Sequence, residues 1–342
     1  MTAALPFPHW LSQALPEPGA WPVWTVRSVH LLHLTGADSL RFLHGQTTQD
    51  LSSVPPGCLR RSCAVTATAR PVALLDVLAD KHAARLVVLA GDGPALHQRF
   101  DRHLFPADQV TLLPMVQAQQ VTVLGDAAPA LLAAEGITMA PPGAGWCSVA
   151  EGNHQALVLR GTDFGDGVPG LRLLLPDPHP LPPWLRHIPR LTGIQAELLR
   201  LQQGTPAWPS EINDAFNPFE LGLAGAVALN KGCYLGQEVL ARLLTYDGVK
   251  QQLRLWRSST ALGNLPEDNV LRDGGGARAG VVTSRSALAT GSVGLAVVRR
   301  AWLGASTLRL GQGAVSLSLP GAAQFPASTN PSSEPPPLEA HP

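Results

Sequence analysis

The chain has 342 residues, enough for roughly two to three domains, and its 33 glycines and 32 prolines favour a turn-rich globular protein over a coiled coil. Its 25 basic and 25 acidic residues cancel, so composition indicates no direct nucleic-acid binding. No apolar run approaches the ~18 residues that a membrane span needs.

The N-terminal segment 1–26 resembles no targeting signal. The first basic residue is Arg27, whereas a secretory signal needs early positive charge and a mitochondrial transit peptide needs arginines. We therefore expect an irregular arm at the start of a cytoplasmic protein. The four scattered cysteines form no CxxC pair, which argues against a disulfide framework and against a metal site held by this chain alone.

The first half of the chain alternates short strands with short helices. A strand near residues 29–34 precedes a helix that Asp38 would cap and Gly45 would end. Two apolar β-runs follow, then a helix that ends before Pro106 and a further strand. Residues 121–137 predict another strand and helix. This order is typical of an α+β layer rather than of a doubly wound sheet.

The second half begins with helices and ends in short strands. Residues 191–206 carry apolar side chains at helical spacing. Residues 227–248 predict a strand, a glycine-flanked turn and a helix from about Gln237. Residues 251–320 predict a small antiparallel β-barrel or sandwich, because short strands alternate with glycines. The tail 321–342 is rich in Pro, Ser and Ala, and we expect it to be disordered.

The most informative stretch is KGCYLGQE, followed four residues later by an arginine. Its members are Lys231, Gly232, Cys233, Tyr234, Leu235, Gly236, Gln237 and Glu238. Positive charge from Lys231 and from the helix start at Gln237 would favour the thiolate form of Cys233. Glu238 and Arg242 have the spacing of an ion pair along a helix. In the alternative interpretation, Cys233 is a buried small apolar residue and the motif is structural.

KGCYLGQEVLAR resembles the signature of the folate-binding YgfZ family, which is related to the glycine-cleavage aminomethyltransferase (T-protein) and supports the maturation of iron–sulfur enzymes. Four further blocks resemble these proteins in the same order, namely residues 34–51, 200–206, 217–223, and 280–286 together with 294–300. The resemblance covers about residues 27–305. It implies a three-lobed aminomethyltransferase-like α+β fold, with two interleaved lobes in residues 27–250 and the barrel in 251–320.

The resemblance also implies tetrahydrofolate or a derivative as the cofactor, in a central pocket, and no bound metal. The residues that it places in this pocket are Gln46, Thr47, Asp76, Arg200, Gln202 and Glu220. For Gln46 and Thr47 the alternative is local capping of a turn.

Two positions depart from the T-protein pattern. T-proteins carry an acidic pair in an early strand, where this chain has only Asp76. The glutamate that grips the pterin edge is matched by Gln202, and an amide cannot accept two parallel hydrogen bonds as a carboxylate does. Either folate binds weakly, or Glu197, Glu211 or Glu220 replaces that glutamate.

The function implied is support for the assembly or repair of iron–sulfur clusters in client enzymes, those of tRNA modification included, through the thiol of Cys233. The partners implied are folate and iron–sulfur assembly proteins or client enzymes, with no membrane. Two alternatives remain open. One is a tetrahydrofolate-dependent aminomethyl or one-carbon transferase, and the other is a folate-binding scaffold without chemistry.

Overall fold

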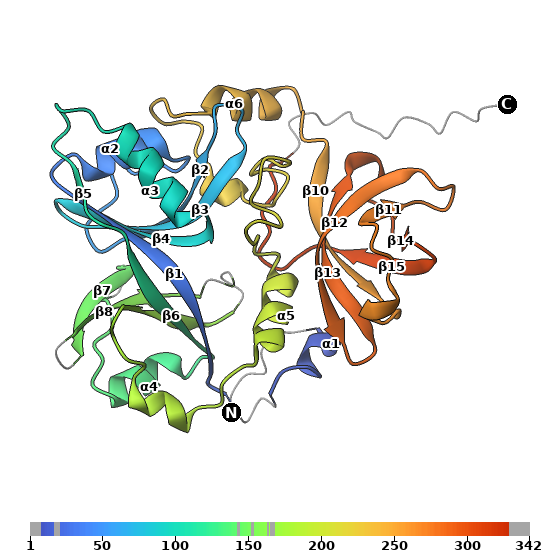
Figure 1. Ribbon diagram of the computed structural model, residues 1–342, viewed down its shortest axis with the longest axis horizontal. Helices are drawn as coiled ribbons and strands as arrows, with labels where there is room; N and C mark the ends of the chain where they lie inside the picture. Colours follow the sequence, from blue (N-terminus) through green and yellow to red (C-terminus); the bar gives the residue numbers. More distant parts are fainter. Residues whose placement is uncertain are drawn as a thin grey trace.

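The structure is a computed structural model that describes residues 8–16, 21–141, 144–151, 154–162, 164 and 168–327. A curved antiparallel sheet and a closed antiparallel barrel stand side by side, with one helix between them (Figure 1). The helix is α5 (Gly193–Gln203). In the described residues, no helix combines the length and the apolar character needed to cross a bilayer.

The sheet runs in the order β2-β3-β4-β1-β6-β9-β8-β7, with the short β5 paired to β1. Its strands are β1 (Val23–Thr35), β2 (Leu59–Val65), β3 (Pro71–Ala79), β4 (Ala83–Gly91), β5 (Thr111–Leu112), β6 (Val116–Leu124), β7 (Trp146–Glu151), β8 (His154–Arg160) and β9 (Gly170–Pro176). The long strand β1 pairs with both β4 and β6 and so joins the two halves of the sheet.

The two faces of the sheet are covered differently. On the outer face, α2 (Ser39–Gln46) and α3 (Gly93–Arg102) cover one half, and α4 (Ala128–Ala134) with η2 (Pro183–His187) covers the other (Figure 1). Each half has its own apolar core there. The inner face shares a third core with α5 and the barrel. The molecule therefore has three lobes that meet at α5.

The barrel closes in the order β10-β13-β12-β11-β14-β15. Its strands are β10 (Gln251–Ser258), β11 (Val270–Arg272), β12 (Arg278–Leu288), β13 (Gly291–Arg299), β14 (Thr307–Leu310) and β15 (Gly313–Ser318). The short 3-10 turns η4 (Leu262–Asn264) and η5 (Arg300–Trp302) lie between these strands, and η3 (Ala224–Ala226) precedes the barrel. Trp256 is fully buried in the barrel core.

The two ends of the chain differ from expectation. The N-terminal arm contains a short helix, α1 (His9–Ser12), in which Leu11 is fully buried, and β1 already begins at Val23. The segment 321–327, expected to belong to a disordered tail, packs against the body. Its backbone bonds to α5 and to residues 222–224, and Phe325 packs on the shared core. Residues 328–342 lie outside the described residues.

Three local expectations are also corrected. Asp38 does not cap α2 with its side chain, because its carboxylate binds Arg41 and the backbone N–H of Gln109 instead. The helix continues through Gly45 and ends at Gln46. Residues 227–230 form no strand.

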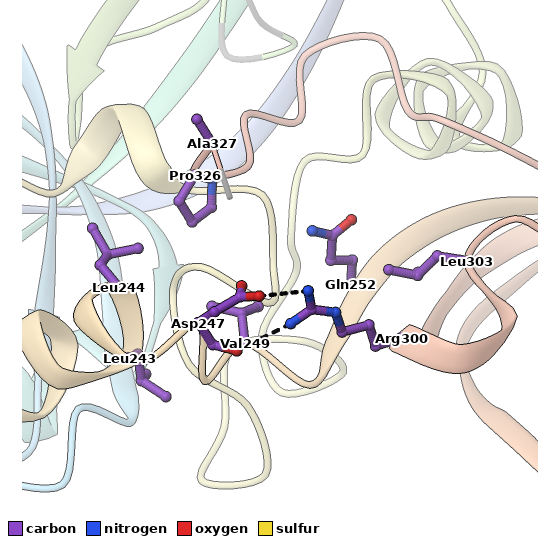
Figure 2. A pocket seen from close by; sticks show the side chains of 9 residues that line it. All are labelled: Leu243, Leu244, Asp247, Val249, Gln252, Arg300, Leu303, Pro326 and Ala327. Carbon is purple, nitrogen blue, oxygen red and sulfur yellow. Dashed lines mark hydrogen bonds and ion pairs between the residues drawn. The ribbon is translucent and has the colours of Figure 1, made fainter. Parts of the chain in front are cut away.

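The helix α6 (Gln237–Thr245) begins where the sequence predicts, and the chain then crosses to the barrel. At this crossing, Asp247 and Arg300 form an ion pair beside a small pocket of about 90 Å³, and Pro326 and Ala327 line the opposite side (Figure 2). The C-terminal segment therefore closes the junction between α6 and the barrel.

Candidate functional site

The KGCYLGQE loop is fastened to the chain that follows α2. The ammonium group of Lys231 donates hydrogen bonds to the backbone carbonyls of His44, Thr47 and Gln49, the last two at 2.8 Å. An ammonium group has three donors, so these carbonyls use all of them. The loop is thus held to the first lobe by a half-buried charge.

These contacts give Lys231 a structural role in addition to the one expected. Its ammonium group also lies 4.6 Å from the centroid of the Tyr234 ring, and burial lowers its pKa to about 8. The group is directed at backbone carbonyls and an aromatic face. Its hydrogen-bonding capacity is spent on anchoring the loop and none is left for the thiol of Cys233.

The remaining motif residues shape the turn. Gly236 has a φ of +82°, and a Cβ added there would meet the carbonyl oxygen of Thr66 at 2.5 Å, so only glycine fits. The Gln237 side chain accepts from the backbone N–H of Tyr234 and donates to the carbonyls of Leu229 and Lys231. The Gln237 side chain therefore holds the turn together through hydrogen bonds to its backbone.

Cys233 is exposed on this turn, whereas Cys63 is buried and burial raises its pKa to about 12. Tyr234, the neighbour of Cys233, points inward. It is 8% exposed, and burial raises the pKa of its hydroxyl, which has no hydrogen-bond partner in the structure. The loop thus buries its tyrosine and presents its thiol, so the interpretation of Cys233 as a buried apolar residue is wrong.

Glu238 and Arg242 form the ion pair that their spacing predicts, at 2.5 Å. The two side chains are 76% and 69% exposed, and such pairs stabilise a protein by only about 0.5 kcal/mol. Both remain accessible to a partner on the same side of α6.

Asp76 is fully buried and held by two arginines. Its oxygens accept from Arg61 at 2.9 and 3.2 Å and from Arg172 at 2.6 Å. Burial alone would raise the pKa of this carboxyl, but the two guanidinium groups hold it well below its usual range. The carboxylate joins β2 and β3 to β9 across the inner face, which is a structural role rather than the catalytic one of a T-protein acid.

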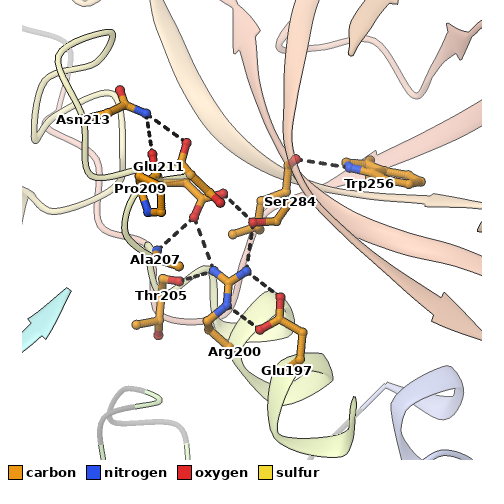
Figure 3. Close-up of polar contacts among 11 residues, drawn as sticks. Glu197, Arg200, Thr205, Ala207, Pro209, Glu211, Asn213, Trp256 and Ser284 are labelled. Atoms are coloured by element: carbon orange, nitrogen blue, oxygen red, sulfur yellow. Dashed lines mark hydrogen bonds and ion pairs between the residues drawn. The ribbon is translucent and has the colours of Figure 1, made fainter. Parts of the chain in front are cut away.

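The guanidinium group of Arg200 likewise makes structural contacts with neighbouring residues (Figure 3). It binds both oxygens of Glu197 at 2.7 and 2.8 Å, the carbonyl of Thr205 at 2.7 Å, Glu211 at 3.4 Å and the hydroxyl of Ser284 at 2.9 Å. A guanidinium group has five N–H donors, and these five contacts use them. Arg200 therefore fastens α5 to the barrel and has no donor left for a cofactor.

The three acids considered as replacements for the pterin-gripping glutamate are also engaged. Glu211 is fully buried and accepts from Ser284 and from the backbone of Ala207. Glu220 accepts from the backbone N–H of Asn217, and burial raises its pKa. Glu197 lines a cavity, but Arg200 binds both its oxygens.

Of the other expected pocket residues, Thr47 is fully buried and donates its hydroxyl to the carbonyl of Leu43, which matches local capping. Gln46 and Gln202 differ from it. The side-chain Oε1 of each is buried and has no hydrogen-bond partner in the structure. An unpaired buried amide oxygen costs about 1–3 kcal/mol, and a ligand donor would remove that cost.

A cavity of about 450 Å³ lies between the inner face of the sheet and α5. Its wall includes Arg27 of β1, Thr122 of β6 and Trp208, which is 51% exposed. Gln120 lies two residues before Thr122 on the same face, is fully buried, and has neither amide atom hydrogen-bonded in the structure.

The cavity residues Arg27, Thr122 and Trp208 are not predicted from the sequence. The pattern of polar residues in β6 nevertheless indicates that a site lies there. The inward positions of this strand carry Gln120 and Thr122 within an otherwise apolar run. Polar residues at buried strand positions need partners, so they mark a place where a ligand or a network is expected. In the part of the chain that the structure describes, no three His, Cys, Asp or Glu residues gather as a metal site.

No family model matches the chain. It is 29% identical over 235 residues to a chloroplastic protein of Arabidopsis thaliana named "Putative transferase", a match that covers 65% of this chain. The chain spans about half the length (52%) of that relative. Among solved structures, it resembles the glycine cleavage system aminomethyltransferase T from Bartonella henselae, with a TM-score of 0.74 and 19% identity, over 90% of this chain and 88% of that one. The expected three-lobed aminomethyltransferase-like fold is confirmed.

Proposed function

We propose that this protein is a folate-binding member of the YgfZ type that presents the thiol of Cys233 to partners in the assembly or repair of iron–sulfur clusters. The observation that carries the proposal is the construction of the KGCYLGQE turn. Lys231 and Gln237 spend their polar groups on backbone atoms, and Cys233 is left exposed. A turn built in this way holds one thiol at a defined place on the surface.

This chain by itself does not supply enough exposed cysteine thiols to hold an iron–sulfur cluster. Iron–sulfur clusters are held by about four thiolates, and the other cysteines (Cys58, Cys63 and Cys147) are half-buried or buried. Cys233 would therefore supply one thiolate to a cluster that is cargo and whose other ligands come from the partner. Leu235, 38% exposed beside the thiol, would contact the same partner.

The folate part of the proposal rests on the central cavity and the unpaired amides. An amide offers one donor and one acceptor, which complements the edge of a pterin. The resemblance assigns this edge to Gln202, whose amide oxygen is unpaired, and Trp208 of the cavity wall offers an aromatic face. When bound, tetrahydrofolate would supply a carrier for one-carbon units. Within this proposal the protein works in the cytoplasm and needs neither a membrane nor nucleic acid.

The test is complementation in cells that lack the protein. Cys233→Ser should fold normally, with a loss of about 1 kcal/mol or less, because an exposed hydroxyl is hydrated. It should fail to restore the activity of iron–sulfur enzymes. Cys147→Ser, at a half-buried thiol of β7, is the matched control and should complement. A Cys233→Ser protein that melts like the parent and complements fully would refute the thiol role.

A second candidate is a tetrahydrofolate-dependent one-carbon transferase, which the names of both relatives favour. The burial of Asp76 between Arg61 and Arg172 counts against it, because that carboxylate cannot reach a substrate. Steady release of tetrahydrofolate from its methylene form, with a one-carbon acceptor present, would support this candidate. Binding without turnover would leave the first.

A further inference from the structure

Tyr234, the neighbour of Cys233 in the KGCYLGQE turn, is buried in a small apolar cluster of its own. The buried members of the cluster are Ala69, Phe219, Tyr234 and Leu240, and partly buried side chains pack on it from both sides of the turn, namely Ala224, Val227, Leu229, Val239, Leu243, Leu244 and Val249. Apart from Ala69, the described members lie within residues 219–249. The burial of Tyr234 therefore depends on the chain just before and just after the turn.

The backbone of the C-terminal segment binds the chain before the turn. The N–H of Gln324 donates to the carbonyl of Gly222 at 2.7 Å, and its carbonyl accepts from the N–H of Ala224 at 3.0 Å. A Cβ added at Gly222 would lie 2.6 Å from the Cβ of Ala323. A Cβ added at Gly225 would meet the side chain of Gln324. The segment is therefore fitted closely against a part of the chain where only glycine leaves room for it.

The chain before the turn is also tied to the loop that anchors Lys231. The hydroxyl of Thr48 donates to the carbonyl of Ala226 at 2.6 Å. The side-chain amide of Gln49 donates to the carbonyl of Gly225 at 2.9 Å. The backbone carbonyl of Gln49 in turn accepts from the ammonium group of Lys231 at 2.8 Å. Gly225 and Lys231 are thus held by the same loop.

The end of the C-terminal segment reaches the chain after the turn. Pro326 and Ala327 line the pocket of about 90 Å³ that Leu243 and Leu244 of α6 also line (Figure 2). These two leucines also pack on the cluster that buries Tyr234. The C-terminal segment therefore contacts supports of this cluster on both sides of the turn.

A cluster with so few buried side chains has little stability of its own. Regions with few buried apolar contacts open locally at a lower free energy than the whole protein unfolds. Contacts that are made from outside such a cluster therefore decide how often it opens. The C-terminal segment makes contacts of this kind, because it is joined to α5 at one end and meets α6 at the other.

We infer that the C-terminal segment 321–327 is a positioning element for Cys233, which keeps Tyr234 buried in its cluster and thereby holds the neighbouring thiol at a fixed place on the surface. The inference rests on the proposed function only for the use that is made of this thiol. When the segment is released, Tyr234 leaves its cluster while the sheet and the barrel stay folded.

The two tyrosines of the chain provide the test, because Tyr234 is 8% exposed and Tyr246 is 78% exposed. N-acetylimidazole acetylates accessible phenol groups, and mass spectrometry of peptides follows each tyrosine separately. At a temperature well below the Tm, a chain that ends at Pro320 should acetylate Tyr234 roughly tenfold faster than the full chain, because local opening is easier. A chain that ends at Ala327 should protect Tyr234 like the full chain, and Tyr246 should react equally in all three.

Substitutions separate release of the segment from general loss of stability. Gln324→Pro removes the N–H that binds Gly222 and should expose Tyr234, whereas Gln324→Ala keeps this N–H and should not. Val158→Ala removes methyl groups from a fully buried position of β8 and lowers the Tm, but it should leave Tyr234 protected. Equal protection in the two truncations, or an equal loss of protection in Val158→Ala, would overturn the inference.

A spin label on Cys233 measures the position of the thiol directly. The label is attached to chains that carry Cys58→Ser and Cys147→Ser, in which the remaining thiol, Cys63, is fully buried. Its mobility should be higher in the chain that ends at Pro320 than in the full chain, and equal mobility would contradict the positioning role. Complementation by Cys233→Ser tests the proposed function separately, because it leaves the C-terminal segment unchanged.

Discussion

The half-buried Gln202 of α5 has a buried amide oxygen without a hydrogen-bond partner in the structure. A glutamate at this position would accept two hydrogen bonds from the donor edge of a pterin, where the amide accepts one. We therefore expect Gln202→Glu to tighten the binding of tetrahydrofolate roughly tenfold, the gain from one charge-assisted hydrogen bond.

Isothermal titration with tetrahydrofolate and its 5-formyl form measures this change. Gln117→Glu adds the same charge at an exposed position of β6 and should leave the affinity as it is. Equal or weaker affinity in Gln202→Glu would show that the pterin is recognised elsewhere in the chain.

Lys231 gives a prediction about stability at the scale of one residue. Lys231→Met keeps an aliphatic chain over Tyr234 but removes the donors of three carbonyls. Each unpaired carbonyl costs about 1 kcal/mol or more, so the free energy of unfolding should fall by about 3 kcal/mol. Urea unfolding checks this against Lys250→Met. Lys250 is exposed, and its variant should change stability by about 0.5 kcal/mol at most. Equal stability of the two variants would show that the carbonyls find other donors.

At the scale of elements, α5 is the piece that connects the lobes. Its N-terminus is closed by a capping box between Thr192 and Gln195, and Gly204 ends it with a φ of +69°. Between these ends, Arg200 ties the helix to the loop 205–211 and to Ser284 of the barrel (Figure 3). The helix is therefore a joint between the sheet and the barrel as well as a wall of the central cavity.

Arg200→Ala should loosen this joint. It leaves the fully buried Glu211 without its cation, and breaking a buried pair costs about 3–5 kcal/mol. Thermal unfolding should show a much lower Tm. The matched variant is Arg242→Ala, which breaks only the exposed pair with Glu238 and should cost about 0.5 kcal/mol. Similar losses of stability in the two variants would contradict the role of Arg200 in connecting α5 to the barrel.

At the scale of the whole molecule, the C-terminal segment 321–327 runs between the lobes. The N–H groups of Gly321 and Ala322 bind α5, and Gln324 exchanges backbone hydrogen bonds with Gly222 and Ala224. The same segment lines a cavity of about 390 Å³ beside β2, β8 and β9 and closes the pocket beside α6. A stretch with little apolar side-chain area is held mainly by its backbone.

Two truncations test this placement. A chain that ends at Pro320 loses these hydrogen bonds and the packing of Phe325, and its Tm should fall by several degrees. A chain that ends at Ala327 keeps every contact described here and should melt like the parent. Identical melting curves for the two truncations would show that the segment adds nothing to the fold.

The sequence by itself determined the class of fold and the position of the glycine-flanked turn, and it left open whether the thiol of Cys233 is exposed or buried. The helical spacing of residues 191–206, the helix start at Gln237 and the glycine-separated strands of the barrel are local patterns, and the structure has these elements. The φ of +82° at Gly236 is a local requirement that explains this glycine, whereas the exposure of Cys233 is a result of tertiary packing.

Only the tertiary structure decided what the charged residues do. Asp76 meets Arg172 because the sheet curves, although 96 residues separate them along the chain. Lys231 meets three carbonyls from residues 44–49, and Arg200 meets a serine of the barrel. The long side chains of these residues can satisfy their charge with whatever the fold brings close, so composition and spacing do not specify their partners. Packing selects those partners, and it leaves Gln120 and Gln202 with buried amide atoms that have no hydrogen-bond partner in the structure.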